Sequence, residues 1–136
     1  MRRNIFYLIL GFVISVSLLY GITLIPHKLI YLEVEDVAKI TIIHGTTGDK
    51  ITIHNSEDIK HLVDNLNNIS IHKLEINLHK GFNYYISLYD NDGNVIEGFA
   101  FTDKRVSNKD FSFSVFKGKL DTQYIEYLYT IYPKDK

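Results

Sequence analysis

The sequence contains no cysteine, and this absence removes several kinds of chemistry at once. Disulfides, thiolate metal sites, a cysteine nucleophile and a lipid-modified N-terminal cysteine are all excluded. A basic excess is also missing, because 15 lysines and arginines stand against 16 acidic residues and give a net charge of -1. Nucleic-acid binding usually requires a basic surface, so we expect no nucleic-acid partner. Only one proline, Pro133, lies beyond residue 26, and the 136 residues leave room for one domain.

A long uncharged run opens the chain. It extends from Ile5 to Ile25 and follows Arg2 and Arg3. A helix of this length reaches about 30 Å, which matches the hydrocarbon thickness of a bilayer. Because the arginines precede the run and acidic residues follow it, the positive-inside rule predicts a cytoplasmic N-terminus. Residues 27–136 would then be extracytoplasmic, and the protein would lie in the cell membrane as a single-pass protein.

A cleaved signal peptide is the competing interpretation of this segment, since it shares the basic start and the apolar stretch. The apolar run is longer than a signal core of about 7 to 15 residues. No A-x-A-like cleavage site ends it, and the nearest imitation, at residues 15–17, lies inside the run. These features favour a retained signal-anchor or transmembrane helix over residues 1–26.

The next ten residues, 27–36, combine apolar positions with a group of acids. They predict either a membrane-proximal linker or an additional edge strand, and both alternatives stay open. Residues 37–136 form the predicted extracytoplasmic domain.

The domain begins with a strand hairpin and a helix. Alternating apolar positions predict strands at 37–44 and 51–54, joined by a six-residue loop over 45–50. A register that pairs His44 with Ile51 places the isoleucines of both strands on one face. Asn55 or Ser56 then caps a helix that ends near Asn67. Its apolar stripe consists of Ile59, Leu62, Val63, Leu66 and Ile69.

Further strands follow. Residues 73–79 alternate and predict a strand with one wet face, a pattern that fits a sheet edge. Strands at 84–89 and 95–102 flank a turn at Gly93, where a tight hairpin requires positive φ. Residues 103–110 read as a polar loop. The strand at 111–115 would turn its apolar residues inward and its serines outward.

A short helix closes the chain. Asp121 or Thr122 caps it, apolar residues follow at helical spacing, and Pro133 ends it. The order of elements predicts an α+β fold: an antiparallel sheet of about five to six strands with two helices packed on one face, preceded by one N-terminal transmembrane helix.

Residue patterns typical of catalysis or metal binding are weak. The six histidines show no HExxH or other paired spacing. Asp90, Asp92 and Asn94 imitate the start of a calcium loop, but Val95 and Phe101 stand where that loop needs Gly and Glu. No G-x-S-x-G is present. The acids and His61 on the first helix of the domain read as a solvated face. We therefore expect no metal, no cofactor and no enzymatic activity.

Two surfaces are candidates for protein contact. Four tyrosines crowd the last helix, and because one side of a short helix faces the core, Tyr127 or Tyr129 should point outward. The strand at 73–79 would offer Lys73, Glu75 and His79 along an edge. The predicted interaction surface comprises these five residues.

Several motifs carry a resemblance. They are Ile40-x-Ile42, Gly45-x-x-Gly48-Asp49-Lys50, Ile51-x-Ile53, Asp58-Ile59-x-x-Leu62-x-x-x-Leu66, and Tyr84-x-Ile86-x-Leu88-Tyr89-Asp90 with Gly93. Over residues 37–131 the chain resembles a domain-of-unknown-function group of small membrane-anchored or lipoprotein-like surface proteins of low-GC Gram-positive bacteria. The chain departs from the lipoprotein members because it has no cysteine. The resemblance implies no catalytic residues.

These observations lead to one main functional prediction. The chain is expected to be a single-pass membrane protein whose extracytoplasmic domain binds another envelope protein or component without catalysing a reaction. A small-ligand sensor with a cleft between sheet and helices is the alternative. A cell-envelope hydrolase is a third, less favoured reading, since the sequence nominates neither a nucleophile nor an acid pair.

Overall fold

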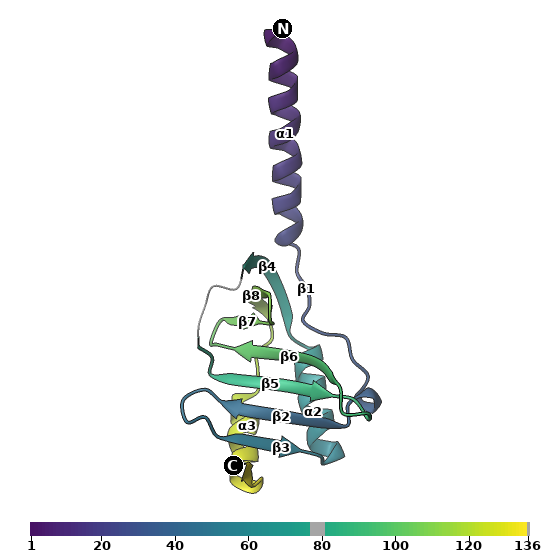
Figure 1. The fold of residues 1–136 in the computed structure, drawn as a ribbon, viewed down its shortest axis with the longest axis vertical. Helices are drawn as coiled ribbons and strands as arrows, with labels where there is room; N and C mark the ends of the chain where they lie inside the picture. The colour runs from purple at the N-terminus through teal and green to yellow at the C-terminus, as the bar shows by residue number, and fades with distance from the viewer. Residues whose placement is uncertain (77–80, 136) are drawn as a thin grey trace.

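The first helix stands apart from the rest of the chain. A computed structural model describes residues 1–76 and 81–135. In it α1 (Arg2–Thr23) projects from one end of the α+β domain, and none of its residues is buried (Figure 1). By length and composition α1 is able to cross a membrane, a requirement that a signal sequence near an N-terminus also meets.

The domain is built on one antiparallel sheet. Among the described residues the sheet has nine strands in the order β1-β4-β8-β7-β6-β5-β2-β3-β9. Their bounds are β1 His27–Lys28, β2 Lys39–His44, β3 Lys50–Ile53, β4 Ser70–Ile76, β5 Tyr84–Tyr89, β6 Val95–Phe101, β7 Arg105–Ser107, β8 Phe111–Lys117 and β9 Lys134–Asp135. The predicted count of five to six strands was too low, because β1, β7 and β9 are only two or three residues long and leave no period in the sequence.

Two α-helices and one short helix complete the domain. These are α2 (Ser56–Asn67), α3 (Thr122–Ile131) and the 3-10 helix η1 (Val34–Asp36), which sequence patterns did not predict. Asn55 caps α2 by accepting hydrogen bonds from the backbone N–H groups of Glu57 and Asp58, at 2.9 and 3.2 Å. Residues of α2, α3 and the sheet share a single buried core, and α2 and α3 lie behind β2, β3 and β5 in Figure 1. The α+β class and the capped helices are confirmed.

The register of the first hairpin differs from the prediction. Ile42 pairs with Ile51 and Ile40 with Ile53, so the strands are shifted by two residues from a pairing of His44 with Ile51. The loop is correspondingly shorter, because the backbone N–H of His44 donates to the carbonyl of Asp49 at 2.8 Å. A shift of two leaves each side chain on its face. The four isoleucines are therefore fully buried, as the alternating pattern predicted.

The polar segment 103–110 is not all loop. It contains β7, which joins β6 to β8 and buries Val106. In β8 the expected burial is wrong at its first two residues, since Phe111 is 43% exposed and Ser112 only 1%. The Ser112 hydroxyl has a partner in the Ser107 hydroxyl at 3.0 Å, which accounts for a serine inside the sheet.

The segment after α1 is an edge strand followed by chain that packs on the domain. In β1, His27 pairs with Ile71 and Lys28 with Ser70. The backbone N–H and carbonyl of Leu32 are both bonded to the side-chain amide of Asn67, at 3.1 and 2.8 Å. Within residues 27–36 the structure thus has a two-residue edge strand, β1, and further along the short helix η1. Only residues 24–26 lie between α1 and β1.

Candidate functional site

The exposed side of α3 carries two large apolar side chains. Tyr127 is 52% exposed and Ile131 is 50% exposed. They lie four residues apart and so share one side of the helix. Ile125 and Leu128 on the other side are fully buried. We call Tyr127 and Ile131 the α3 ridge.

A shared carboxylate joins the two helices beside this ridge. The hydroxyl of Tyr124 donates to Asp58 Oδ1, and the hydroxyl of Tyr132 donates to Asp58 Oδ2, each at 2.5 Å. Burial, followed by the hydrogen bond to Asp58, raises the pKa of Tyr132 to about 12 and raises the pKa of Tyr124 well above its usual value. Both hydroxyls therefore remain protonated hydrogen-bond donors at neutral pH.

A second polar pair extends the same cluster. His61 Nε2 lies 3.0 Å from Asp121 Oδ2, and the His61 ring stacks on Tyr124 with 3.7 Å between centroids. Asp121 also caps α3 by accepting from the backbone N–H of Tyr124 at 3.1 Å. The hydrogen bond from His61 and then the one from Tyr124 lower the pKa of the Asp121 carboxyl. We call Asp58, His61, Asp121, Tyr124 and Tyr132 the interhelix cluster.

The sequence did not predict this cluster. Asp58 and His61 were interpreted as part of a solvated face, whereas the structure gives both of them aromatic or acidic partners on α3. The only sign of the cluster in the sequence is the spacing of three residues between Asp58 and His61, which places both on one side of the helix. The partners lie more than sixty positions away in the case of Asp58, and no periodicity reports how two helices pack.

Tyr129 has a different environment from Tyr127. Its hydroxyl donates to the backbone carbonyls of Ile42 at 3.0 Å and Asp49 at 3.2 Å. The side chain is half-buried, and burial raises its pKa far above the usual value. Of the two tyrosines named from the sequence, the structure turns Tyr127 outward and bonds Tyr129 into the first hairpin.

Tyr129 also borders a second polar group at the same end of the sheet. The Nδ1 of His44 accepts from the backbone N–H of Thr46 at 3.2 Å, so the proton of the neutral ring is on Nε2, which lies 3.4 Å from Glu126 Oε1. The hydroxyl of Tyr84 donates to the same carboxylate oxygen. Burial and this hydrogen bond raise the pKa of Tyr84 to about 12. The Glu126 carboxylate thus holds the Tyr84 hydroxyl and the His44 ring in fixed positions.

The other predicted contact residues fall on or beside β4. Lys73 and Glu75 are residues of that strand. Glu75 pairs with Ser112 of β8, next to an irregularity in the register of the two strands. His79 lies outside the described residues. Lys73 and Glu75 thus belong to β4 and not to α3, and the role of all three positions in contact stays a prediction.

One large hollow lies beside the N-terminal end of α2. It has a volume of about 520 Å³ and forms where η1 and the start of β2 meet the first turn of α2. Its lining includes Val34, Ala38, His54, Ser56, Lys60 and Asn91. Within the described part of the chain, no three His, Asp or Glu side chains gather closely enough to hold a metal ion.

Comparisons with known proteins do not assign a family. No protein-family model matches the chain, and no curated protein or solved structure is significantly similar to it.

Proposed function

We propose that the protein is a single-pass protein of the cell membrane, anchored by α1 with its N-terminus in the cytoplasm. Its extracytoplasmic domain binds another envelope protein and catalyses no reaction. The orientation rests on Arg2 and Arg3 at the start of α1, opposite the acids that follow the helix. The resemblance to small anchored surface proteins of Gram-positive bacteria agrees with this location.

One observation supports the choice of the α3 ridge as the binding surface. The α3 ridge exposes a tyrosine and an isoleucine side by side, on a helix that the interhelix cluster fixes to α2. Rigid aromatic side chains bind at low entropic cost, and tyrosine is enriched among the residues that dominate interface energies. The ridge therefore combines an anchor with a support that is already ordered before binding.

Site-specific photo-cross-linking in intact cells tests this proposal. A photoreactive phenylalanine analogue replaces Tyr127 in one version of the full chain and Tyr31 in another. Tyr31 is the matched control because it is 87% exposed and lies outside α2 and α3. We expect a discrete adduct from position 127 and none from position 31.

A second version tests the energetic role of the ridge. The photoreactive residue is placed at Thr130, which is exposed on α3, with Tyr127→Ala in the same chain. Loss of a central tyrosine typically costs about 2 kcal/mol, so the adduct should fall by at least tenfold. Equal adduct yields from positions 127 and 31 would reject the α3 ridge as the binding surface. An adduct yield at position 130 that Tyr127→Ala leaves unchanged would reject it as well.

The hollow at α2 supports a second candidate function. Its volume of about 520 Å³ lies within the range of small-molecule sites. A small-ligand sensor would bind there. A screen of envelope fragments that raises the unfolding temperature of the intact chain, but not that of an Ala38→Leu variant, would favour the sensor over the protein-binding domain.

A further inference from the structure

The link between α1 and the domain is very short. α1 ends at Thr23 and β1 begins at His27. A fully extended chain covers about 3.5 Å per residue, so these two positions are at most about 14 Å apart. β1 is itself fixed to β4, because Lys28 pairs with Ser70 and Leu29 donates its backbone N–H to the Ile69 carbonyl at 2.9 Å. With α1 in a bilayer, this sheet edge has to remain next to the lipid headgroups.

Two lysines face the same way at this edge. Ser70 of β4 pairs with Lys28 of β1 on one side and with Lys117 of β8 on the other. Residues directly opposite one another in a sheet project to the same face, so both ammonium groups lie on one side of the edge. Both lysines are exposed, and neither has an ion-pair partner in the described part of the chain.

Three lysines elsewhere in the domain are paired with acids. Lys50 pairs with Asp135 at 3.8 Å, Lys60 with Asp64 at 2.5 Å and Lys134 with Asp49 at 2.6 Å. Of the acids that follow β1, Glu35 and Asp36 lie on η1, which packs against α2, and Glu33 is the N-cap residue of η1. Among the described side chains, no acid pairs with Lys28 or Lys117 next to the membrane anchor.

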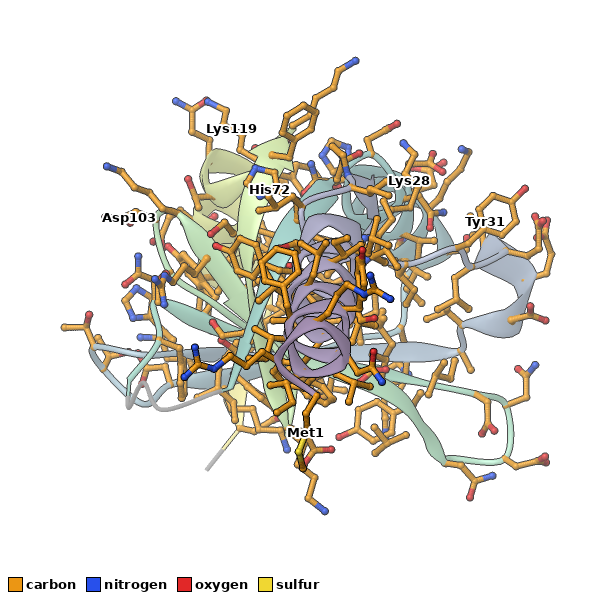
Figure 2. The ribbon with its side chains drawn as sticks, turned by 90° about the horizontal axis from the view of Figure 1, so that it is seen from above. Met1, Lys28, Tyr31, His72, Asp103 and Lys119 are labelled. Atoms are coloured by element: carbon orange, nitrogen blue, oxygen red, sulfur yellow. The ribbon has the colours of Figure 1, made fainter. Side chains whose placement is uncertain are left out.

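Aromatic rings accompany the two lysines. Phe116 is 56% exposed and lies against the His72 ring, with 5.2 Å between centroids. In Figure 1, β4 and β8 are at the α1 end of the domain, and Figure 2, which looks down α1, places His72 and Lys28 close to the helix axis. Phenylalanine together with lysine is typical of segments that lie in the membrane–water interface.

We propose that Lys28, His72, Phe116 and Lys117, which we call the basic edge, bind anionic phospholipid headgroups and hold the domain against the bilayer. The inference rests on the proposed function in one respect, namely that α1 lies in the membrane. The lipid surface is the occupant that the geometry supplies, since the short link keeps β1 within about 14 Å of the end of α1, a distance comparable to the Debye length of about 10 Å. The α3 ridge belongs to a different element and is left available for a protein.

A fluorescence experiment on the full chain tests this proposal. Because the chain has no cysteine, a single introduced cysteine carries the only label. The label is placed at Tyr31, which is exposed and outside the basic edge, and the protein is put into nanodiscs of phosphatidylcholine with or without phosphatidylglycerol. A quencher attached to the lipid headgroup reports the distance of the label from the bilayer. Labels at Ile14 in α1 and at Tyr127 serve as references.

The expected result is stronger quenching at position 31 in the anionic discs. Each lysine near an anionic surface changes the ratio of docked to undocked domain by roughly fivefold. Lys28→Gln with Lys117→Gln should therefore lower that ratio by roughly 25-fold, and high salt should do the same. The charge-matched control, Lys39→Gln with Lys50→Gln, should leave it unchanged. Soluble inorganic phosphate added to neutral discs should have no effect, since a surface is required.

Two results would overturn the inference, and they are distinguishable. Equal quenching at position 31 in both kinds of disc, with the Ile14 label quenched from the acyl chains, would reject the basic edge while α1 remains a membrane helix. An Ile14 label that no lipid quencher reaches would reject the membrane anchoring in the proposed function, and the basic edge with it.

Discussion

The hydroxyl of Tyr132 donates to Asp58 Oδ2 at 2.5 Å and so connects two residues that are 74 positions apart in the chain. Tyr132 is the C-cap residue of α3, and Asp58 lies in the first turn of α2. Tyr124 bonds to the other oxygen of the same carboxylate. One side chain of α2 thus fixes both ends of the α3 segment that carries the α3 ridge.

Asp58→Ala should destabilise the domain by about 2 kcal/mol, because it leaves two half-buried hydroxyl groups without their charged acceptor. Urea unfolding of the full chain in detergent micelles, followed by the near-ultraviolet circular dichroism of tyrosine, measures the change. Asp64→Ala is the control. Its carboxylate is exposed and pairs with Lys60 on the same helix, so its loss should cost no more than about 0.5 kcal/mol. Equal effects of the two variants would show that Asp58 does not join the helices.

Tyr129→Phe and Tyr127→Phe should differ in the same assay. Removing the hydroxyl of Tyr129 deletes hydrogen bonds to two backbone carbonyls and should cost about 1 kcal/mol. No hydrogen bond within the described residues uses the hydroxyl of exposed Tyr127, so its removal should be neutral within about 0.5 kcal/mol. A neutral Tyr129→Phe would contradict the placement of that side chain.

The contrast between these two tyrosines shows what the sequence could predict and what it could not. The apolar period of α3 placed Ile125 and Leu128 in the core, and both are fully buried. That period also required one of the flanking tyrosines to point outward. It could not say which, because the environment of Tyr129 depends on two carbonyls of a hairpin that lie 80 and 87 positions earlier.

The strands show the same limit. Alternation identified β2 and β3 and the face that each residue occupies, since a shift of two residues leaves faces unchanged. It did not determine the register, which the hydrogen bond between His44 and Asp49 sets within the loop. β7 has only three residues, too few to show a period. Its Ser107 pairs with Ser112 of β8, which is buried although it is polar, so the usual pattern of buried apolar and exposed polar positions is absent there.

Alkaline pH should weaken the domain between about pH 10 and 12. The folded state raises the pKa values of Tyr84 and Tyr132 to about 12, while a tyrosine in an unfolded chain titrates near 10. In this window the folded state binds more protons than the unfolded state. The stabilisation is fully present below pH 10 and is lost as the pH rises toward 12, by up to about 1.4 kcal/mol per pH unit for each group.

The double variant Tyr84→Phe with Tyr132→Phe tests the origin of this loss. Urea unfolding at several pH values across the window should give a shallower slope for the double variant than for the parent chain. Tyr31→Phe, which alters an exposed ring, should keep the parent slope. An unchanged slope in the double variant would mean that the alkaline loss comes from other groups.

Gly45→Ala should be the most damaging single change in the first hairpin. A Cβ atom at this position would lie 1.7 Å from the backbone carbonyl oxygen of Phe82, and a backbone atom cannot rotate away. The N–H of Gly45 also donates to the Asn83 carbonyl at 2.7 Å, so relief of the clash would break that bond. We expect a loss of more than about 3 kcal/mol in urea unfolding.

Gly48→Ala, three residues further along the same loop, is the matched control. Its Cβ would meet nothing within 4 Å, and only the positive φ of 75° disfavours alanine, at a cost of about 1 kcal/mol. Gly45→Ala should in addition move the Asp49 carbonyl that Tyr129 uses, so combining it with Tyr129→Phe should cost less than the sum of the two single changes. Equal losses for the two glycine variants would show that the loop does not pack against Phe82 and Asn83.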